Sequence, residues 1–251
     1  VRRSPYDEVF VYSNIFRMAA AAYGTVSNFA SCLQTITGSY SVYFDIQVPC
    51  FTNENCTGFL AYSLATKSII LSFGTSKNAY KQLLNNTVES IFYKRRKSPL
   101  GYGSGLVSDA LFSIYYQMQL NGIIEKTHDL LKFFDGYELW ITGHSIGGAI
   151  ASFAAAKIAS DNVIEANLVK FVTFGQPRVG NKAWAAAIEN SILYFASNSS
   201  IANSSSLENY KVCTSGEDKH CKNSDNIFNI NDHTNYYGIN VAEFGLNGCS
   251  E

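Results

Sequence analysis

A serine that could act as a nucleophile lies at position 145. Residues 143–147 read Gly-His-Ser-Ile-Gly, after a short apolar run at 138–142 and before small residues with helical spacing at 148–160. A serine in such a strand-to-helix turn is held with its hydroxyl exposed, and the turn is so tight that its flanking positions must be glycine. The small residues let the helix pack closely against the strand. The pattern predicts a catalytic Ser145; the alternative is a glycine-rich turn with an incidental serine.

Ser145 needs a base within hydrogen-bonding distance, because a serine hydroxyl is a poor nucleophile at neutral pH. The usual base is histidine, and the chain has four. His144 lies inside the turn with its side chain directed away from that of Ser145, and His128 precedes the nucleophile, whereas in such folds the base follows it. His220 lies in a charged stretch next to Cys221, and His233 follows the last strand candidate. We therefore predict that His233 is the base; an ordinary loop histidine is the alternative.

Two hydrogen-bond donors must stabilise the negative charge that develops on the attacked carbonyl oxygen, and each contributes about 3 kcal/mol. The backbone N–H of Ile146, directly after the nucleophile, is predicted to be one donor. The second comes from a loop after an earlier strand, and Thr75 follows the apolar run 68–73 in a Gly-Thr-Ser turn. Thr75 could donate through its backbone and its hydroxyl. The alternative is a plain turn that closes a strand.

Strand-like and helix-like segments alternate along the chain, and their order predicts the fold. Crossover helices between strands give a parallel sheet, whose ligands bind at the carboxyl ends of the strands. We therefore predict an α/β-hydrolase fold with a mostly parallel central sheet and helices on both faces, in a single domain over residues 1–251. The expected elements are a helical pattern at 6–35, strands at 42–48, 59–64 and 68–73, one long amphipathic helix at 111–134, a strand at 168–174, a helix at 182–190 and a strand at 192–196.

Composition favours a secreted protein. Hydrophobic residues make up 47% of the chain and the net charge is −1, which gives no electrostatic reason to expect a nucleic acid partner. No apolar run reaches the roughly 20 residues of a transmembrane helix. The first residue is Val1, and the absence of a leader after it is expected of a mature chain whose signal peptide has been removed. Four glycosylation sequons fit the secretory pathway: Asn55, Asn85, Asn198 and Asn203.

The six cysteines form an even set without a Cys-x-x-Cys pair. This pattern favours disulfide bonds over a metal site. No metal or organic cofactor is expected for the chemistry of Ser145.

Taken together, these motifs resemble the class 3 lipase family of secreted fungal and nematode triacylglycerol lipases. The resemblance covers most of the chain and rests on four segments: 72–76 (SFGTS), 143–152 (GHSIGGAIAS), 171–181 (FVTFGQPRVGN) and 232–239 (DHTNYYGI). It implies Ser145 as nucleophile, His233 as base, and Thr75 and Ile146 as oxyanion donors. It further implies three disulfide bonds: Cys32–Cys249, Cys50–Cys56 and Cys213–Cys221. It also implies a lid at 78–84 that shields the site until a lipid surface is met; the alternative for this segment is an ordinary surface helix.

The chain departs from this family in two places. The family commonly has an arginine in the oxyanion turn, whereas Phe73 runs directly into Gly74 here. The catalytic aspartate that follows the 192–196 strand in the family is also missing, because residues 197–203 contain no acid. Glu208 is the first acid after that strand and our candidate for the role. Asp218 and Asp225 lie further on, and Asp232 adjoins His233 too closely to bond its ring easily.

The sequence thus predicts a secreted lipase that hydrolyses glycerolipid esters through an acyl-Ser145 intermediate, with a lipid ester and a lipid–water interface as partners. Two alternatives stay open. One is a lipase-like protein that binds lipid without efficient turnover because the acid is missing. The other is an enzyme of this fold that acts on a small soluble ester. The basic run 94–97 could favour anionic lipid surfaces, or it could be an ordinary solvated loop.

Overall fold

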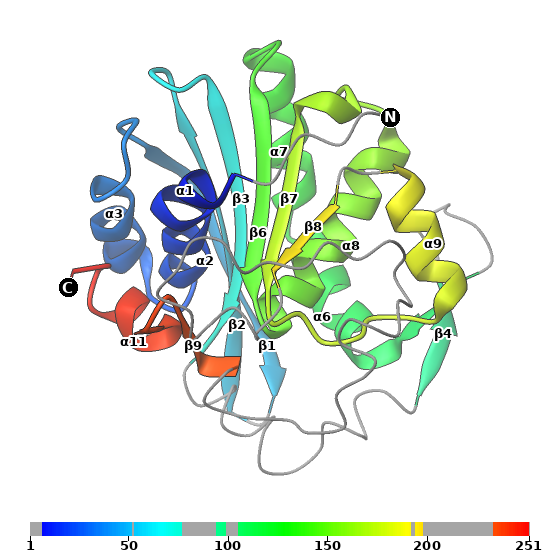
Figure 1. Ribbon diagram of the computed structural model, residues 1–251. Coiled ribbons are helices and arrows are strands. Elements are labelled where there is room, and N and C mark those ends of the chain that lie inside the picture. Colours follow the sequence, from blue (N-terminus) through cyan, green and yellow to red (C-terminus); the bar gives the residue numbers. More distant parts are fainter. Residues whose placement is uncertain are drawn as a thin grey trace.

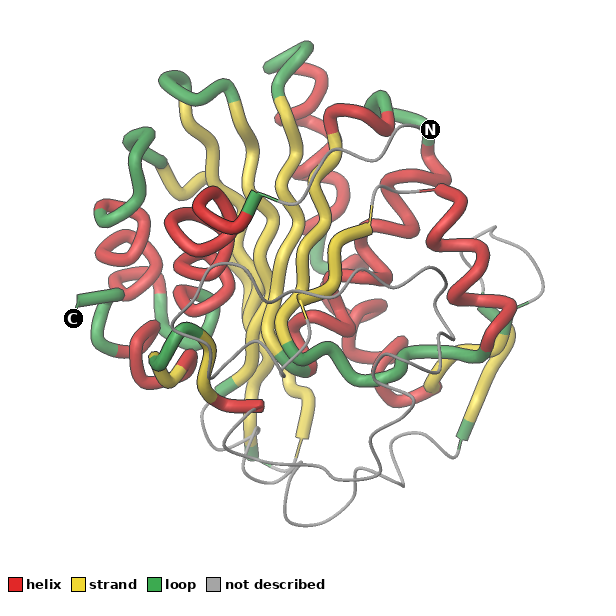
Figure 2. Tube along the Cα trace, in the orientation of Figure 1, coloured by secondary structure: helices red, strands yellow, loops and turns green. Residues whose placement is uncertain are grey.

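The computed structural model describes residues 7–51, 53–76, 94–98, 105–191, 194–197 and 233–250 (Figures 1 and 2). Several sequence predictions concern residues outside these ranges. They are the lid at 78–84, His220, the Cys213–Cys221 bond, the sequons at Asn85, Asn198 and Asn203, and the acids Glu208, Asp218, Asp225 and Asp232.

A six-stranded mixed sheet forms the centre of the described structure (Figure 1). Its order is β1-β2-β3-β6-β7-β8; the first two pairs are antiparallel, and the β3–β6, β6–β7 and β7–β8 pairs are parallel. The α/β fold with a largely parallel sheet is therefore confirmed. The strand bounds are β1 Ser41–Phe51, β2 Glu54–Ser63, β3 Ser68–Thr75, β6 Glu138–His144, β7 Val169–Phe174 and β8 Tyr194–Ser197.

Helices cover both faces of this sheet. On one face lie α1 (Glu8–Phe10), α2 (Arg17–Ala21), α3 (Val26–Gln34) and α11 (Val241–Leu246); on the other lie α6 (Asp109–Leu120), α7 (Ile123–Phe133), α8 (Ile146–Asp161) and α9 (Lys182–Ser191) (Figures 1 and 2). Successive strand residues face opposite cores, as a pleated strand requires. In β3, Leu71 packs with the core under α6 to α8, whereas Ile70 packs with the core under α2 and α11.

The chain before the first strand folds into two helical stretches. Helices α1 and α2 are joined by η1 (Val11–Phe16), a π-helical segment, so the helical backbone is continuous over residues 8–21. The carboxylate of Asp7 caps its start by accepting a hydrogen bond from the backbone N–H of Phe10 at 2.9 Å. The first stretch ends before Gly24, and α3 forms a separate helix, so the helical pattern at 6–35 is interrupted.

The prediction of one long helix before the nucleophile strand is wrong. The segment forms two helices, α6 and α7, separated by Asn121 and Gly122. Gly122 has a φ of 96°, a left-handed conformation that glycine adopts readily and that ends a right-handed helix. The apolar spacing continues on both sides of this break, so the pattern suggested one helix.

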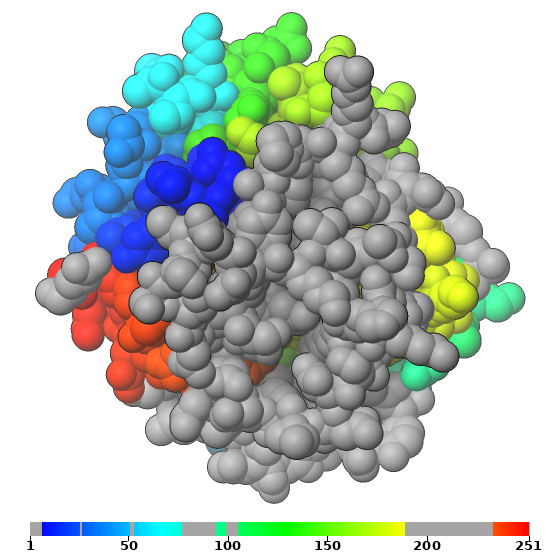
Figure 3. Space-filling view, viewed as in Figure 1, coloured from blue at the N-terminus to red at the C-terminus, as the bar shows by residue number. Residues whose placement is uncertain are grey.

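The C-terminal segment lies against the N-terminal helices. It contains a two-stranded ribbon, β9 (Asn235–Tyr236) and β10 (Ile239–Asn240), followed by α11. In the space-filling view its orange and red atoms adjoin the blue atoms of the first helices (Figure 3). A Cβ added to Gly245 of α11 would lie 1.8 Å from the carbonyl oxygen of Ala20, so α11 packs directly on the backbone of α2. Among the helices of the described residues, none is long and apolar enough to cross a membrane.

Candidate active site

Ser145 lies in a sharp turn between β6 and α8. Its φ of 56° and ψ of −121° are unusual for a residue with a side chain, and such strain costs about 1–3 kcal/mol. The sheet holds the turn in place, because the backbone N–H of Ser145 donates to the carbonyl of Phe174 in β7 at 2.9 Å. A Cβ on Gly147 would lie 2.1 Å from the carbonyl oxygen of Phe73 in β3, so this position accepts only glycine. The turn has the nucleophile-elbow geometry that the sequence predicted.

The structure brings His233 to Ser145. The ring Nε2 of His233 lies 3.0 Å from Ser145 Oγ, although the two residues are 88 positions apart in the sequence. At this distance a histidine can accept the proton of a serine hydroxyl. Both side chains are shielded from water, with exposed fractions of 1% for Ser145 and 9% for His233.

Gly175 leaves room for the His233 ring. It follows β7 and has a φ of 54°, and a Cβ at this position would lie 2.8 Å from His233 Nδ1. Any side chain here would therefore displace the ring. The end of β7 thus limits where the base can lie.

His144 connects the nucleophile turn to the base. Its Nε2 lies 2.8 Å from the backbone carbonyl oxygen of His233, to which it donates, and its Nδ1 accepts a hydrogen bond from the hydroxyl of Tyr23. Both bonds are formed by one neutral tautomer. Burial lowers the pKa of His144 to about 4, which keeps the ring neutral at neutral pH. Because strand residues alternate between faces, His144 points away from Ser145, as predicted, yet it reaches the backbone of His233.

The contribution of Tyr23 and His144 was not found in the sequence. His144 was considered only as a possible base for Ser145. The one available signal was the position of His144 at the end of the strand candidate, where alternation directs its side chain to the face opposite Ser145. Tyr23 carries no such signal, since it lies 121 positions from His144.

Thr75 ends β3 next to the nucleophile turn. It is fully buried, and its Oγ1 has no hydrogen-bond partner within the described residues. A buried hydroxyl without a partner calls for an explanation, and a ligand oxygen would supply one. A Cβ on Gly147 would lie 2.9 Å from Gly74 Cα, so the neighbours of Thr75 and Ile146 are in direct backbone contact. The N-terminus of the long helix α8 adds its partial positive charge at Ile146.

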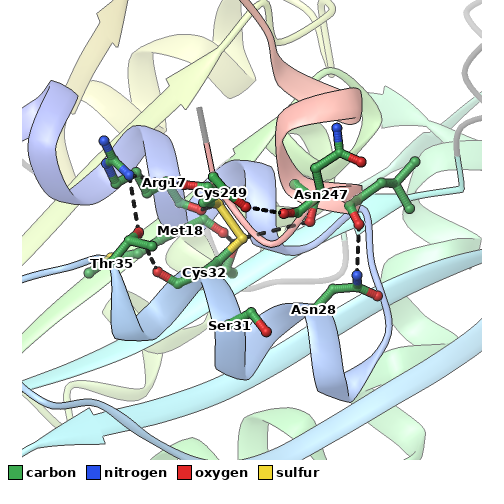
Figure 4. Close-up of a disulfide and its surroundings, with 12 residues drawn as sticks. Arg17, Met18, Asn28, Ser31, Cys32, Thr35, Asn247 and Cys249 are labelled. Carbon is green, nitrogen blue, oxygen red and sulfur yellow. Dashed lines mark hydrogen bonds between the residues drawn. A yellow bond between two sulfur atoms is a disulfide. The ribbon is translucent and has the colours of Figure 1, made fainter.

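Long-range contacts fix the segment that carries His233. A disulfide joins Cys249 to Cys32 in α3 across 217 positions, with a Cα–Cα distance of 4.7 Å (Figure 4). Asn28 Nδ2 donates to the carbonyl of Leu246 at 2.8 Å, and Arg17 Nη1 donates to the carbonyl of Cys249 at 3.3 Å. Both contacts tie the region after α11 to the N-terminal helices.

Two further features complete this part of the chain. The structure contains a Cys50–Cys56 disulfide at the end of the β1–β2 hairpin, so two of the three pairs implied by the resemblance are present in it. Asn55 of the first sequon lies exposed in β2. In the ranges that the structure describes, no group of three or more His, Cys, Asp or Glu side chains is arranged to hold a metal ion.

The solved structures most similar to this chain include two lipases. Lipase II from Rhizopus niveus is 21% identical, with a TM-score of 0.78 and 97% of each chain covered. A triacylglycerol lipase whose catalytic centre is formed by a serine protease triad is also 21% identical, with a TM-score of 0.77 and 99% of each chain covered. These likenesses show the fold.

The sequence comparisons identify the family. Lipase ZK262.3 of Caenorhabditis elegans is 25% identical over 86% of this chain and 73% of its own length. A lipase of Rhizomucor miehei is 29% identical over 49% of this chain and 40% of its own length. The family model for class 3 lipases matches residues 68–205, which include Thr75 and the turn at Ser145. The chain therefore belongs to the class 3 lipase family of ester hydrolases.

Proposed function

We propose that this protein hydrolyses carboxylic esters of glycerolipids through an acyl-Ser145 intermediate. The observation that supports this most directly is the 3.0 Å separation of Ser145 Oγ and His233 Nε2 at the end of β6. His233 accepts the hydroxyl proton while Ser145 Oγ attacks the ester carbonyl carbon. The proton then passes to the departing alcohol oxygen. Water, deprotonated by the same ring, hydrolyses the acyl-serine and releases the fatty acid.

The negative charge of each tetrahedral intermediate lies on the former carbonyl oxygen. The backbone N–H of Ile146 and the N–H and hydroxyl of Thr75 donate to this oxygen. The unpartnered Oγ1 of Thr75 supports this role, because the oxyanion would satisfy a hydroxyl that is otherwise buried without a bond.

His144 and Tyr23 serve as positioning residues. Neutral His144 donates to the backbone of His233 and accepts from Tyr23, so it fixes the main chain of the base without charging the site. A permanent positive charge beside His233 would oppose its protonation in the transition state. The low pKa of His144 avoids this conflict.

Glycerolipid esters are the substrate class favoured by the family. Among similar proteins are the secreted mono- and diacylglycerol lipase MDL5 of Malassezia globosa and secreted mono- and diacylglycerol lipase A of Penicillium cyclopium. Their names, together with the two disulfides, also support secretion of this protein.

The residue that orients His233 remains a separate proposal. We assign Glu208 to this role because it is the first acid after β8. The absence of an acid at 197–203 favours a second candidate function, a lipid-binding protein with slow turnover. Loss of the acid lowers turnover by several powers of ten in well-studied triads without abolishing it. Glu208→Gln should therefore lower kcat strongly, and unchanged turnover would remove Glu208 from the mechanism.

Labelling with a fluorophosphonate probe tests the proposed nucleophile. Wild-type protein should be labelled and Ser145→Ala should not. Ser152→Ala is a matched control, because within the described residues the hydroxyl of this buried serine of α8 bonds only to the carbonyl of Ala149, and the change should leave labelling intact. No labelling of folded wild-type protein would contradict the enzyme function. If labelling succeeds, faster hydrolysis of emulsified triacylglycerol than of a soluble short-chain ester supports a lipase; the reverse favours a soluble-ester hydrolase.

A further inference from the structure

A short basic hairpin lies beside α6. Its strands are β4 (Arg95–Lys97) and β5 (Leu106–Ser108), paired antiparallel with Arg96 opposite Val107 and Lys97 opposite Leu106. Val107 is fully buried, and on the same face the guanidinium of Arg96 lies 4.8 Å from the Phe112 ring. Alternation along the strands therefore turns Arg95, Lys97 and Leu106 outward.

The outward face of the hairpin combines two cations with a leucine. Arg95 and Lys97 are exposed, and Leu106 is 36% exposed. The acid Asp109 is engaged on the other face, where its oxygens lie 3.5 Å from Arg96 Nη1 and 3.4 Å from Lys94 Nζ. Among the described residues, no acid is paired with Arg95 or Lys97.

The segment after β7 links this hairpin to the sheet. Residues 179–181 run along the edge of β5 that faces away from β4: the N–H of Ser108 donates to the carbonyl of Val179 at 2.8 Å, and the N–H of Asn181 donates to the carbonyl of Leu106 at 2.9 Å. We call Arg95, Lys97 and Leu106 the basic surface.

The basic surface lies at the catalytic end of the sheet. Gly175, which contacts the His233 ring, is only four residues before Val179, and four residues of chain span at most about 14 Å. Figure 1 shows β4 and the start of α9 at the lower right, at the same end as the lower tips of β6 and β7. In the space-filling view, the turquoise atoms of this hairpin adjoin the yellow atoms of α9 at the molecular surface (Figure 3).

We propose that the basic surface docks the protein on anionic phospholipid surfaces, with the catalytic end of the sheet facing the lipid. This inference rests on the proposed function, since it places the site where a lipid ester is present. Arginine and lysine attract lipid phosphates, and an exposed leucine on the neighbouring strand can enter the boundary between headgroups and acyl chains. The net charge of the whole chain is −1, so attraction to an anionic surface comes from this local cluster and orients the molecule.

Vesicle binding by the Ser145→Ala protein tests docking without hydrolysis. Binding should be tighter to mixed phosphatidylcholine and phosphatidylglycerol vesicles than to pure phosphatidylcholine, and should weaken at 1 M salt, where the Debye length falls to about 3 Å. Arg95→Gln with Lys97→Gln should weaken binding about 25-fold, because each cation near an anionic surface contributes about fivefold. Leu106→Ser should weaken binding by a smaller factor on the same vesicles.

Lys67→Gln with Lys132→Gln provides the matched control. Both lysines are exposed and lie at the opposite end of the sheet, since the carbonyl of Lys67 accepts from the N–H of Glu138 at the start of β6 and Lys132 is in the last turn of α7. This variant removes the same charge and should bind like the parent protein. Equal loss in both double variants, or no preference for phosphatidylglycerol, would overturn the proposal. Tighter binding to a duplex oligonucleotide than to the vesicles would overturn it in favour of a nucleic acid.

The same variants separate docking from catalysis. With Ser145 intact, Arg95→Gln with Lys97→Gln should keep its fluorophosphonate labelling and its rate on a soluble ester. If labelling fails while vesicle binding keeps its dependence on these cations, the proposed function fails and the docking surface stands. If labelling succeeds while vesicle binding does not depend on these cations, the docking surface fails and the proposed function stands.

Discussion

Ser145 and His233, the two side chains that we propose react with the substrate, are positioned in different ways. Ser145 depends on its neighbours in the sequence: its turn joins β6 directly to α8, and glycine at position 147 allows close contact with β3. His233 depends on residues far away in the sequence, through a hydrogen bond from His144 across 89 positions and a disulfide from Cys249 that closes 217 positions. The position of the proposed nucleophile is therefore a local feature of the chain, and that of the proposed base is a feature of the tertiary structure.

This difference predicts how each side chain can be disturbed. Changes that loosen distant contacts should move His233 while the Ser145 turn stays intact. His144 belongs to both parts, because its backbone ends β6 and its side chain holds His233. Four variants, each with a comparison variant, test this difference between Ser145 and His233.

The largest effect is expected from removing the long disulfide. Cys32→Ser with Cys249→Ser should lower the free energy of unfolding by about 5 kcal/mol, because the bond closes a loop of 217 positions. Cys50→Ser with Cys56→Ser, which opens a loop of 6 positions, should lower it by about 2 kcal/mol. Urea denaturation monitored by circular dichroism measures both. Equal losses would show that loop length does not determine the contribution of the long bond.

The next effect is on the pH dependence of stability. Burial lowers the pKa of His144 to about 4, against about 6.5 in an unfolded chain. Between these values the unfolded chain binds more protons, so the free energy of unfolding should fall by about 3 kcal/mol from this group as pH decreases from 6.5 to 4. The stabilisation is fully present above pH 6.5.

Urea titrations at several pH values measure this dependence. In the variant His144→Asn, the fall in the free energy of unfolding between pH 6.5 and pH 4 should be about 3 kcal/mol smaller than in wild-type protein. His128→Asn is the comparison, because His128 is partly exposed and its Nε2 lies 3.3 Å from Asp161 Oδ2. Burial lowers the pKa of His128, and the charge of Asp161 opposes this effect. A wild-type pH dependence in His144→Asn would show that His144 is not buried in its neutral form.

A change at Gly175 should disturb the base from the end of β7. Gly175→Ala would place a Cβ 2.8 Å from His233 Nδ1 and should lower kcat about 100-fold, because a displacement of about 1 Å in a catalytic group can have that effect. Gly136→Ala introduces similar backbone strain at a φ of 77°, but its Cβ would meet no atom within 4 Å. Steady-state kinetics on a soluble ester compare the two. The same kcat in both variants would mean that strain, and not contact with His233, causes the loss.

The smallest effect is expected at Tyr23. Tyr23→Phe removes the hydroxyl that donates to His144 Nδ1 and should lower kcat about tenfold with KM unchanged, since loss of a buried donor leaves its acceptor unsatisfied at about 1–3 kcal/mol. Tyr40→Phe makes the same chemical change near the amino end of β3, where the hydroxyl bonds to Ser68 at 3.0 Å. Its kcat should match that of wild-type protein. A similar fall in both would count against a positioning role for Tyr23.

Many elements could be predicted because their patterns are local. The apolar run at 68–73 and the continuous run at 168–174 match β3 and β7 closely, and the family and fold were recognised from short motifs. The break at Gly122 was missed because apolar spacing continues across it. The prediction of one domain over 1–251, the lid, the third disulfide and the acid Glu208 remain predictions, since they concern the chain as a whole or residues outside the described ranges.

The sequence by itself determined the nucleophile turn and its place in a lipase fold. Five consecutive residues specify that turn, and a strand and a helix on either side are enough to position it. Only the tertiary structure decided how His233 meets Ser145, because Tyr23, His144 and Gly175 come together there from distant parts of the chain, and the Cys32–Cys249 disulfide fixes the segment after α11. Contacts between distant segments depend on how whole layers pack, and no short pattern in the chain records that packing.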